Sequence, residues 1–249
     1  LDPIQRIEGK ESPVSWDTAL EAFARILRKY RPGRTGFLLS RSSSVEDLYL
    51  AQDFIAKHMK GAQVAVDTPP NRLPTSDRFL IRMDKHANTA GLLALGMKPG
   101  KRDWLNLFKK TSEGKIDALV VVGHEITQLH PGSIQARRRL KELVVISSND
   151  GVTPSMATLV LPVAVFAERD GVVVNCDNRT QLFRKAFEPM GQSRPEWLIW
   201  RDLLGRFGTP RLLDSGETVF RAVASKVRAF DGLSYEKLGQ SGVLLKGRR

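Results

Sequence analysis

Two short polar segments carry the residue types that could bind an anionic ligand. The first, residues 41–44 (Arg-Ser-Ser-Ser), stands directly ahead of a segment with helical spacing. A helix N-terminus presents free N–H groups, so hydroxyls and a guanidinium placed there would suit a phosphate. The alternative is a polar turn that only caps the helix, because Ser43 and Glu46 have the spacing of a capping box. We favour the capping interpretation.

The second segment is residues 123–125 (Gly-His-Glu), which follow the apolar run Ala118–Val122. Ligands of open α/β sheets bind beyond the carboxyl ends of the strands, so this loop could face a nucleotide. A single glycine after a strand is weak evidence, and a simple turn is the favoured interpretation. We expect no cofactor-binding residue; if a vestigial site persists, we expect four residues to form it: Ser42, Ser43, Gly123 and His124.

No catalytic or metal-binding set emerges from the sequence. Glu168, Asp170 and His124 could tune one another's pKa as an acid–base group, but no nucleophile or metal ligand set accompanies them. We expect Glu168 instead to pair with Arg179 and fix a hairpin-like turn. The four histidines lack metal-ligand spacing, and Cys176, the one cysteine, cannot by itself hold an iron–sulfur cluster, which normally needs four thiolates. We predict no catalytic residue and no metal site.

A sheet must position these segments. Apolar, β-branched runs without polar alternation predict strands that are buried on both faces. Such runs occupy residues 35–40, 63–66, 118–122, 143–146 and 158–161. Helical spacing marks the segments between and around them, among others 15–30, 133–141 and 195–207. Alternating strands and helices predict an α/β fold with a doubly wound, mainly parallel, Rossmann-like sheet.

The two ends of the chain differ from this core. We expect residues 1–13 to form an extended lead-in. After residue 208, apolar positions predict one helix over about 217–230 and a further turn at 234–238, followed by a basic, glycine-containing end. We therefore divide the chain into an α/β domain over residues 1–208 and a helical C-terminal extension over residues 209–249 that serves as a docking tail.

The charge of the chain suggests the kind of partner. Its 249 residues carry a formal net charge of +12, which attracts acidic surfaces. The basic residues are dispersed and no aromatic residues interleave with them, so we expect acidic protein neighbours and no nucleic acid. No apolar segment reaches the roughly 20 residues that span a bilayer, and we see no leader. We predict a cytoplasmic location without direct membrane insertion.

Several motifs along the chain match a known family pattern. The most specific block contains Leu159-Val-Leu-Pro162 and then Glu168, Gly171, Asn175, Arg179 and Gln181. Other matching segments are Pro13–Leu20, Ser40–Tyr49, Asn88–Gly96, Val121–Glu125, Ser193–Trp197 and Ser234–Gly239. Together they resemble the molybdopterin oxidoreductase superfamily of the dimethyl sulfoxide reductase type. Within it they look most like the C-terminal part of the large iron–sulfur subunit of NADH:quinone oxidoreductase, respiratory complex I.

The departures from the family pattern shape what the resemblance implies. Members carry a cysteine-rich region and an inserted second α/β domain that this sequence lacks, and their pterin is gripped between two domains. His124-Glu125 also replaces the usual Asn-Pro. The resemblance therefore implies a cofactor-free structural subunit of a complex I-like NADH:quinone oxidoreductase or a related electron-transfer complex, peripheral to the membrane through that complex. Iron–sulfur clusters and flavin would lie on partner chains.

The same motifs support an enzymatic alternative. In that interpretation the chain is a pterin-binding fragment of a molybdenum or tungsten oxidoreductase such as formate dehydrogenase. It would then hold a guanine-dinucleotide pterin at the Ser42 and Gly123 loops.

Overall fold

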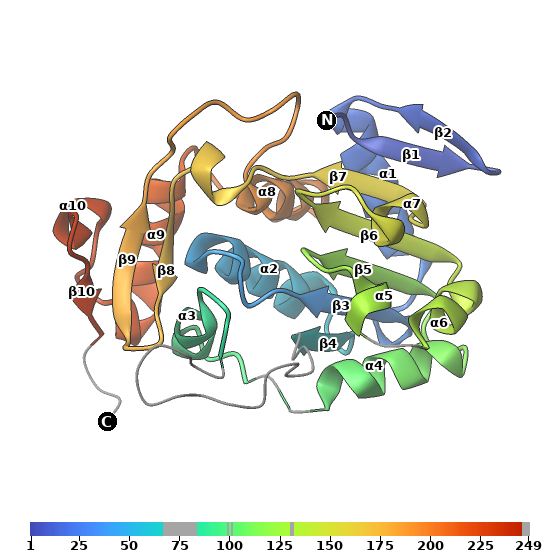
Figure 1. The fold of residues 1–249 in the computed structure, drawn as a ribbon, viewed down its shortest axis with the longest axis horizontal. Coiled ribbons are helices and arrows are strands. Elements are labelled where there is room, and N and C mark those ends of the chain that lie inside the picture. The colour runs from blue at the N-terminus through green and yellow to red at the C-terminus, as the bar shows by residue number, and fades with distance from the viewer. Residues whose placement is uncertain (67–83, 99, 101, 130–131, 246–249) are drawn as a thin grey trace.

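The computed structural model describes residues 1–66, 84–98, 100, 102–129 and 132–245. The main sheet has five parallel strands in the order β7-β6-β5-β3-β4, with an antiparallel hairpin of β1 and β2 beside β7 (Figure 1). Its strands are β1 (Ile4–Ile7), β2 (Lys10–Pro13), β3 (Thr35–Leu39), β4 (Gln63–Val66), β5 (Ala118–Val122), β6 (Glu142–Ser147) and β7 (Leu159–Pro162). The predicted doubly wound, mainly parallel α/β fold is confirmed.

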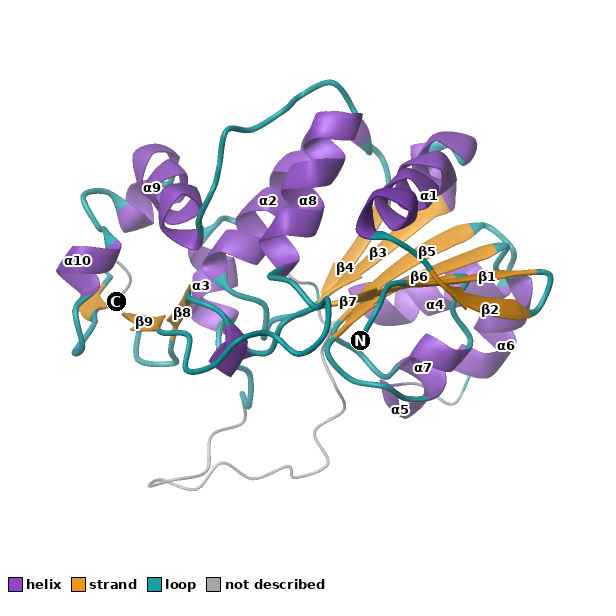
Figure 2. Ribbon diagram, turned by 90° about the horizontal axis from the view of Figure 1, so that it is seen from above, coloured by secondary structure: helices purple, strands orange, loops and turns teal. Residues whose placement is uncertain are grey.

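Helices cover both faces of this sheet (Figure 2). One face carries α1 (Trp16–Lys29), α2 (Val45–His58) and α8 (Glu196–Arg206). The other carries α4 (Asp103–Ser112), α6 (Ser133–Arg139) and the short helices α5 (Ile126–Leu129) and α7 (Val152–Ser155). Within the described parts of the chain, no helix has the length and apolar character needed to cross a membrane.

The core on the first face is built around Trp200 of α8, which is 0% exposed. Its ring centroid lies 6.3 Å from that of Phe23 in α1, 6.4 Å from that of Phe37 in β3 and 6.0 Å from that of Phe54 in α2. Tilted aromatic pairs at such spacings are favourable beyond the area they bury. One side chain therefore connects three helices with the sheet.

The N-terminal segment is more ordered than the expected extended lead-in. Residues 4–13 form a β-hairpin whose turn residues Glu8 and Gly9 have φ angles of 49° and 80°. Positive φ at both central residues is typical of the type I′ turn, which suits the twist of a hairpin. The Arg6 guanidinium donates to the carbonyl oxygens of Pro154 and Ala157, at 2.7 and 2.9 Å. These long-range bonds fix the hairpin to α7.

A second, smaller unit packs beside α2. Its three-stranded sheet has the order β10-β9-β8, formed by β8 (Gly171–Val174), β9 (Arg179–Phe183) and β10 (Val243–Leu244). Three further helices surround it: α3 (Thr89–Ala94), α9 (Gly216–Lys226) and α10 (Tyr235–Leu238). The C-terminal segment thus adds a strand as well as helices, and it shares the hydrophobic core of the first face. The division of the chain at residue 208 stays a prediction.

One helix in this unit is shorter than expected. The prediction of a single helix over 217–230 is wrong, because α9 ends at Lys226 and Val227 takes an extended conformation with φ −108° and ψ 105°. Residues 228–230 then form a separate 3₁₀ turn that places Phe230 against Phe220, with ring centroids 5.9 Å apart. The bend brings the last helix, α10, back to the small sheet.

We expect Phe54→Ala to lower the free energy of unfolding by about 3–5 kcal/mol, because it removes a large side chain from a filled core. Phe54 is 0% exposed and contacts Trp200 and Phe207. Phe166→Ala is the matched control, since Phe166 is 73% exposed. Urea denaturation followed by tryptophan fluorescence measures both, and equal losses for the two variants would contradict the packing described here.

Candidate functional site

The order of the parallel strands reverses between β3 and β5, because β4 follows β3 on one side and β5 lies on the other. Open α/β sheets bind ligands at such a point, beyond the carboxyl ends of the strands. Two loops begin there, residues 40–44 and residues 123–125, and they touch each other. Gly123 has φ of +65°, and a Cβ built on it would lie 3.5 Å from the Cβ of Ser40. Glycine therefore suits the positive φ of the turn.

The structure brings three of the four predicted residues to this edge. Ser42 and Gly123 are exposed, and His124 is half-buried beside them. The Ser42 backbone N–H donates to the hydroxyl oxygen of Ser40 at 3.1 Å, which tightens the first loop. The His124 Nε2 lies 3.3 Å from the carbonyl oxygen of Leu39, so the second loop is tied to the end of β3. Ser42, Gly123 and His124 therefore share the switch point.

Ser43 faces the other way. Its hydroxyl donates to the Oε2 atom of Glu196 at 2.8 Å, and the residue is only 6% exposed. The predicted capping box of Ser43 with Glu46 is wrong by one residue. The structure forms it from Ser44 and Asp47, with the Asp47 N–H donating to Ser44 Oγ and the Ser44 N–H donating to Asp47 Oδ2. This register leaves Glu46 free to turn inward.

Glu125 anchors the second loop. Its carboxylate accepts the Thr153 N–H at 3.0 Å and the Thr127 hydroxyl at 2.7 Å, and it also accepts the Thr153 hydroxyl. Burial by itself would raise the pKa of the Glu125 carboxyl, but the bonds from Thr153 and Thr127 outweigh it and lower that pKa. Glu125 is thus a carboxylate that connects the loop to α7.

A buried carboxyl cluster lies behind the first loop, and sequence reasoning missed it. We define it as Glu46, Asp47 and Glu196 together with Arg169, all at most 9% exposed. Asp47 forms an ion pair with Arg169 at 2.7 Å and accepts the Trp197 N–H at 2.9 Å. The acidic pair at 46–47 was visible in the sequence as part of a family motif. Nothing local indicated that residues more than a hundred positions away would surround it.

Within the described part of the chain, Glu46 and Glu196 have neutral hydrogen-bond donors instead of ion pairs. Glu46 accepts the Val172 N–H at 3.0 Å and the Tyr235 hydroxyl at 2.8 Å. Burial raises the pKa of Glu46 to about 7. Burial, and secondarily the nearby Asp47 carboxylate, raises the pKa of Glu196 to about 8. A charge removed from water is costly without a close counter-ion, which explains why the pKa values of both Glu46 and Glu196 are raised.

The carboxylates around β8 have structural partners. Glu168 accepts the Val165 and Met190 N–H groups at 2.9 and 3.0 Å. The predicted pair of Glu168 with Arg179 is wrong, since the Arg179 guanidinium donates to the Ser241 carbonyl oxygen at 3.2 Å. The cause is the strand β10, which no local pattern indicated and which places the backbone of residues 241–242 beside Arg179.

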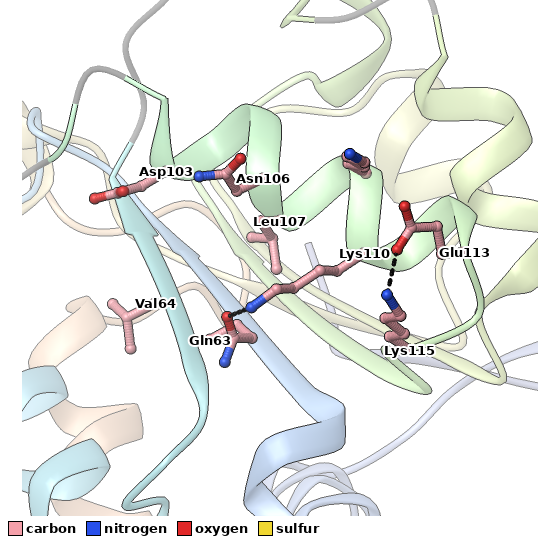
Figure 3. Close-up of a pocket in the computed structure, with 9 residues that line it drawn as sticks. Gln63, Val64, Asp103, Asn106, Leu107, Lys110, Glu113 and Lys115 are labelled. Atoms are coloured by element: carbon pink, nitrogen blue, oxygen red, sulfur yellow. Dashed lines mark hydrogen bonds and ion pairs between the residues drawn. The ribbon is translucent and has the colours of Figure 1, made fainter.

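A depression of about 350 Å³ lies elsewhere, between the amino end of β4 and α4 (Figure 3). Its lining includes Gln63, Lys110, Glu113 and Lys115, and the Lys110 ammonium donates to the Gln63 side-chain oxygen. Because the switch point lies at the carboxyl ends of the strands, this depression is not part of it. Among the described residues, no group of three or more His, Cys, Asp or Glu side chains is placed to hold a metal ion.

The fold and the switch-point loops define a doubly wound α/β domain of the kind that binds a ligand at its sheet edge. A family model described as molybdopterin oxidoreductase matches residues 78–206, just over half of the chain. The matched stretch includes β5, β6, β7 and the loop at 123–125. The chain belongs to the molybdopterin oxidoreductase family.

The chain is similar in sequence to several curated proteins, of which three are described here. The F420-dependent formate dehydrogenase 2 subunit alpha of Methanococcus maripaludis is 37% identical over 93 residues, which are 36% of this chain and 14% of that protein. A nitrate reductase of Symbiobacterium thermophilum is 30% identical over 146 residues, 55% of this chain and 19% of the relative. The NADPH-Fe(3+) oxidoreductase subunit alpha of Geobacter sulfurreducens is 29% identical over 146 residues, 57% and 17% respectively. The chain spans less than a fifth of the length of each of these three relatives.

Family membership contradicts the prediction of a cofactor-free chain and bears on the predicted family resemblance. The prediction that this chain has no cofactor of its own, with clusters and flavin only on partner chains, is contradicted, because members of this family bind the molybdopterin cofactor and iron–sulfur clusters. The resemblance to the superfamily is confirmed. The narrower resemblance to a complex I subunit is not supported, since the matching relatives include formate dehydrogenase and nitrate reductase subunits.

We expect Asp47→Asn to lower the free energy of unfolding by about 3–5 kcal/mol, because it leaves the buried Arg169 charge without its counter-ion. Asp17→Asn is the matched control, since the Asp17 side chain is 90% exposed in its pair with Arg206. Urea denaturation at neutral pH measures both variants. A loss for Asp47→Asn no larger than that of the control would show that the ion pair is dispensable.

The raised pKa of Glu46 makes stability depend on pH. Its carboxyl binds a proton more tightly in the folded chain, with a pKa of about 7, than at its ordinary value of 4.5. Its contribution to the free energy of unfolding is therefore fully present below pH 4.5 and is lost as the pH rises through 7. We expect the urea midpoint to fall between about pH 5.5 and about pH 8.5, and to fall less in Glu46→Gln. Glu188→Gln, at an exposed carboxylate, should behave as the wild type.

Proposed function

We propose that this chain is a pterin-binding part of a molybdenum or tungsten oxidoreductase of the formate dehydrogenase or nitrate reductase kind. The observation that carries the proposal is the family match over residues 78–206, which includes the strands and one of the loops at the switch point. The names of the relatives favour this enzymatic interpretation over a scaffold subunit of a complex I-like assembly.

The residues at the switch point fit the nucleotide end of such a cofactor in part. Ser42 and Gly123 are exposed, so a ligand could reach the Ser42 hydroxyl and the Gly123 Cα, while the N–H groups of both residues are bonded within the chain, to Ser40 Oγ and to the Ile146 carbonyl oxygen. His124 lies beside them, with its Nε2 atom 3.3 Å from the Leu39 carbonyl oxygen. Ser43 does not fit, because its hydroxyl is bonded to Glu196. We therefore assign Ser42, Gly123 and His124 to the site and leave Ser43 out of it.

The helix that follows the first loop does not serve as a free anion site. The Ser44 and Asp47 N–H groups at the start of α2 are used by the capping box, and two buried acids stand in its first turn. A phosphate there would face carboxyl groups. We place the ligand over the exposed loops instead. The cofactor, when bound, supplies the redox chemistry, and the residues of this chain bind and orient it.

The names of the relatives and the net charge of this chain together suggest which proteins bind it. Relatives named as alpha subunits belong to multi-subunit oxidoreductases, and we propose other electron-transfer subunits as neighbours of this chain. The net charge of +12 favours acidic surfaces on them. A cytoplasmic location, peripheral to a membrane through those subunits, is part of the same proposal.

The test is the pterin content of the full chain, purified together with the proteins that accompany it. We expect acid extraction to release a fluorescent pterin in stoichiometric amount, and its absence from the assembled complex would refute the proposal. Gly123→Ala should lower the content at least about tenfold, because a side chain strains a left-handed position and stands in the ligand's path. Gly208→Ala is the matched control: φ there is +79°, with open space around it. Equal pterin content in the two variants would remove Gly123 from the site.

A further inference from the structure

The amino edge of the main sheet, opposite the switch point, carries a hollow between two helices. α4 and α6 pack against each other, and each ends shortly before the strand that follows it in the chain (Figure 1). Their C-terminal ends therefore lie near the amino ends of β5 and β6. A hollow of about 460 Å³ is found there, lined by Ser112 of α4 and by Gln135, Arg138 and Arg139 of α6. We call it the α4–α6 groove.

Three exposed cations surround this groove. Arg138 and Arg139 line it, and Lys109 lies one turn before Ser112 on the exposed side of α4. Within the described parts of the chain, none of these three side chains forms an ion pair or donates a hydrogen bond. We call them the groove cations. Their positive charge is available to a molecule outside the chain.

The acids close to the groove already have basic partners. Glu113, which follows α4, pairs with Lys115 at 2.7 Å. Asp117, just before β5, pairs with Lys141 at 3.2 Å and with Arg34. These carboxylates therefore do not balance the groove cations, and an excess of positive charge is left at this edge of the sheet.

An apolar side chain accompanies the cations on each of the two helices. Leu105 stands four residues before Lys109 in α4, and Ile134 stands four residues before Arg138 in α6. Side chains four positions apart lie on the same side of a helix. Leu105 is 36% exposed and Ile134 is 49% exposed. Both helices thus present an apolar residue beside a cation.

We propose that the α4–α6 groove docks a partner protein through a segment that carries both carboxylates and apolar side chains. The carboxylates pair with the groove cations, since a guanidinium can donate two parallel hydrogen bonds to one carboxylate. The apolar side chains cover Leu105 and Ile134. A nucleic acid fits this surface less well, because phosphates gain nothing from apolar neighbours and the rings of Trp104 and Phe108 in α4 are buried, away from any base.

This docking surface goes beyond the function proposed above and does not depend on it. The cofactor site is assigned to the carboxyl ends of the strands, and the α4–α6 groove lies near their amino ends. A complex that releases no pterin would refute the proposed function and leave the docking surface standing.

Fluorescence anisotropy of a labelled peptide tests the groove in the full chain. The probe repeats the triplet Glu-Glu-Leu about four times. We expect its dissociation constant to rise at least about tenfold in Arg138→Gln/Arg139→Gln, because charge-assisted contacts are lost, and to rise with added salt. Lys226→Gln/Arg228→Gln is the matched control, since it removes the same charge from exposed positions and Lys226 also lies in the last turn of a helix. Equal effects of the two double variants would overturn the proposal, because binding would then reflect net charge alone.

A second variant tests the apolar part without a change of charge. We expect Ile134→Ser to weaken peptide binding at least about threefold, because apolar area is lost from the contact. Ile7→Ser is its control, at a residue that is 60% exposed on the N-terminal hairpin, and it should bind as the wild type does. All the substituted side chains are exposed, so the urea midpoints should stay unchanged. A wild-type chain that does not bind the peptide at low salt, or an Ile134→Ser chain that binds it fully, would contradict the proposal.

A labelled oligothymidylate of similar charge separates a protein partner from a nucleic acid. We expect it to bind more weakly than the peptide and to be insensitive to Ile134→Ser, because it has no apolar side chain to place there. Tighter binding of the oligonucleotide that is lost in Arg138→Gln/Arg139→Gln would assign the groove to nucleic acid and overturn the proposal.

Discussion

The ion pair between Asp47 and Arg169 is the interaction on which the arrangement of the chain most depends. The Asp47 carboxylate closes the capping box of α2, accepts the Trp197 N–H in the first turn of α8, and neutralises the guanidinium of Arg169, two residues before β8 begins. Three segments far apart in the sequence therefore meet at one buried side chain. Because a buried charge is tolerated only with partners on several sides, the pair fixes their relative positions.

The same cluster explains why the switch point has an outer and an inner side. Ser42, Gly123 and His124 lie on the outer side, where two loops meet beyond the strands. Ser43 and Ser44 lie on the inner side and take part in the network of carboxyl groups. A run of three serines thus serves two purposes, because Ser42 is exposed while Ser43 and Ser44 are buried and bonded to carboxyl groups.

Membership in the molybdopterin oxidoreductase family fits this division. A cofactor bound by loops needs backbone that is open on one side and held firmly on the other. In the proposed arrangement, Ser42 and Gly123 lie on the exposed side, and Glu125 and Glu196 hold the second and the first loop from the inner side. Acids with raised pKa values are common at functional sites as well as in structural networks, so their location one layer behind the loop decides their role.

The sequence by itself determined the elements whose cause is local. Apolar β-branched runs placed the strands of the parallel sheet, because strands buried on both faces need no polar alternation. Helical periodicity placed α1, α2 and α8. The glycine at 123 marked a loop at the carboxyl end of β5. Family motifs also indicated the correct superfamily. Comparison with known proteins did not support the narrower resemblance to complex I, and it contradicted the predicted absence of a cofactor.

Only the tertiary structure decided the rest. Whether Ser43 or Ser44 caps α2 depends on Trp197 and Arg169, which contact Asp47 from 150 and 122 positions away. The hairpin at the N-terminus depends on carbonyl groups near residue 155, and the partner of Arg179 depends on a strand at residue 243. Each of these contacts joins residues that no local pattern relates, since burial and charge pairing are properties of the folded chain. The pKa of a buried carboxyl is decided in the same way, because the desolvation that raises it exists only after the helices have packed.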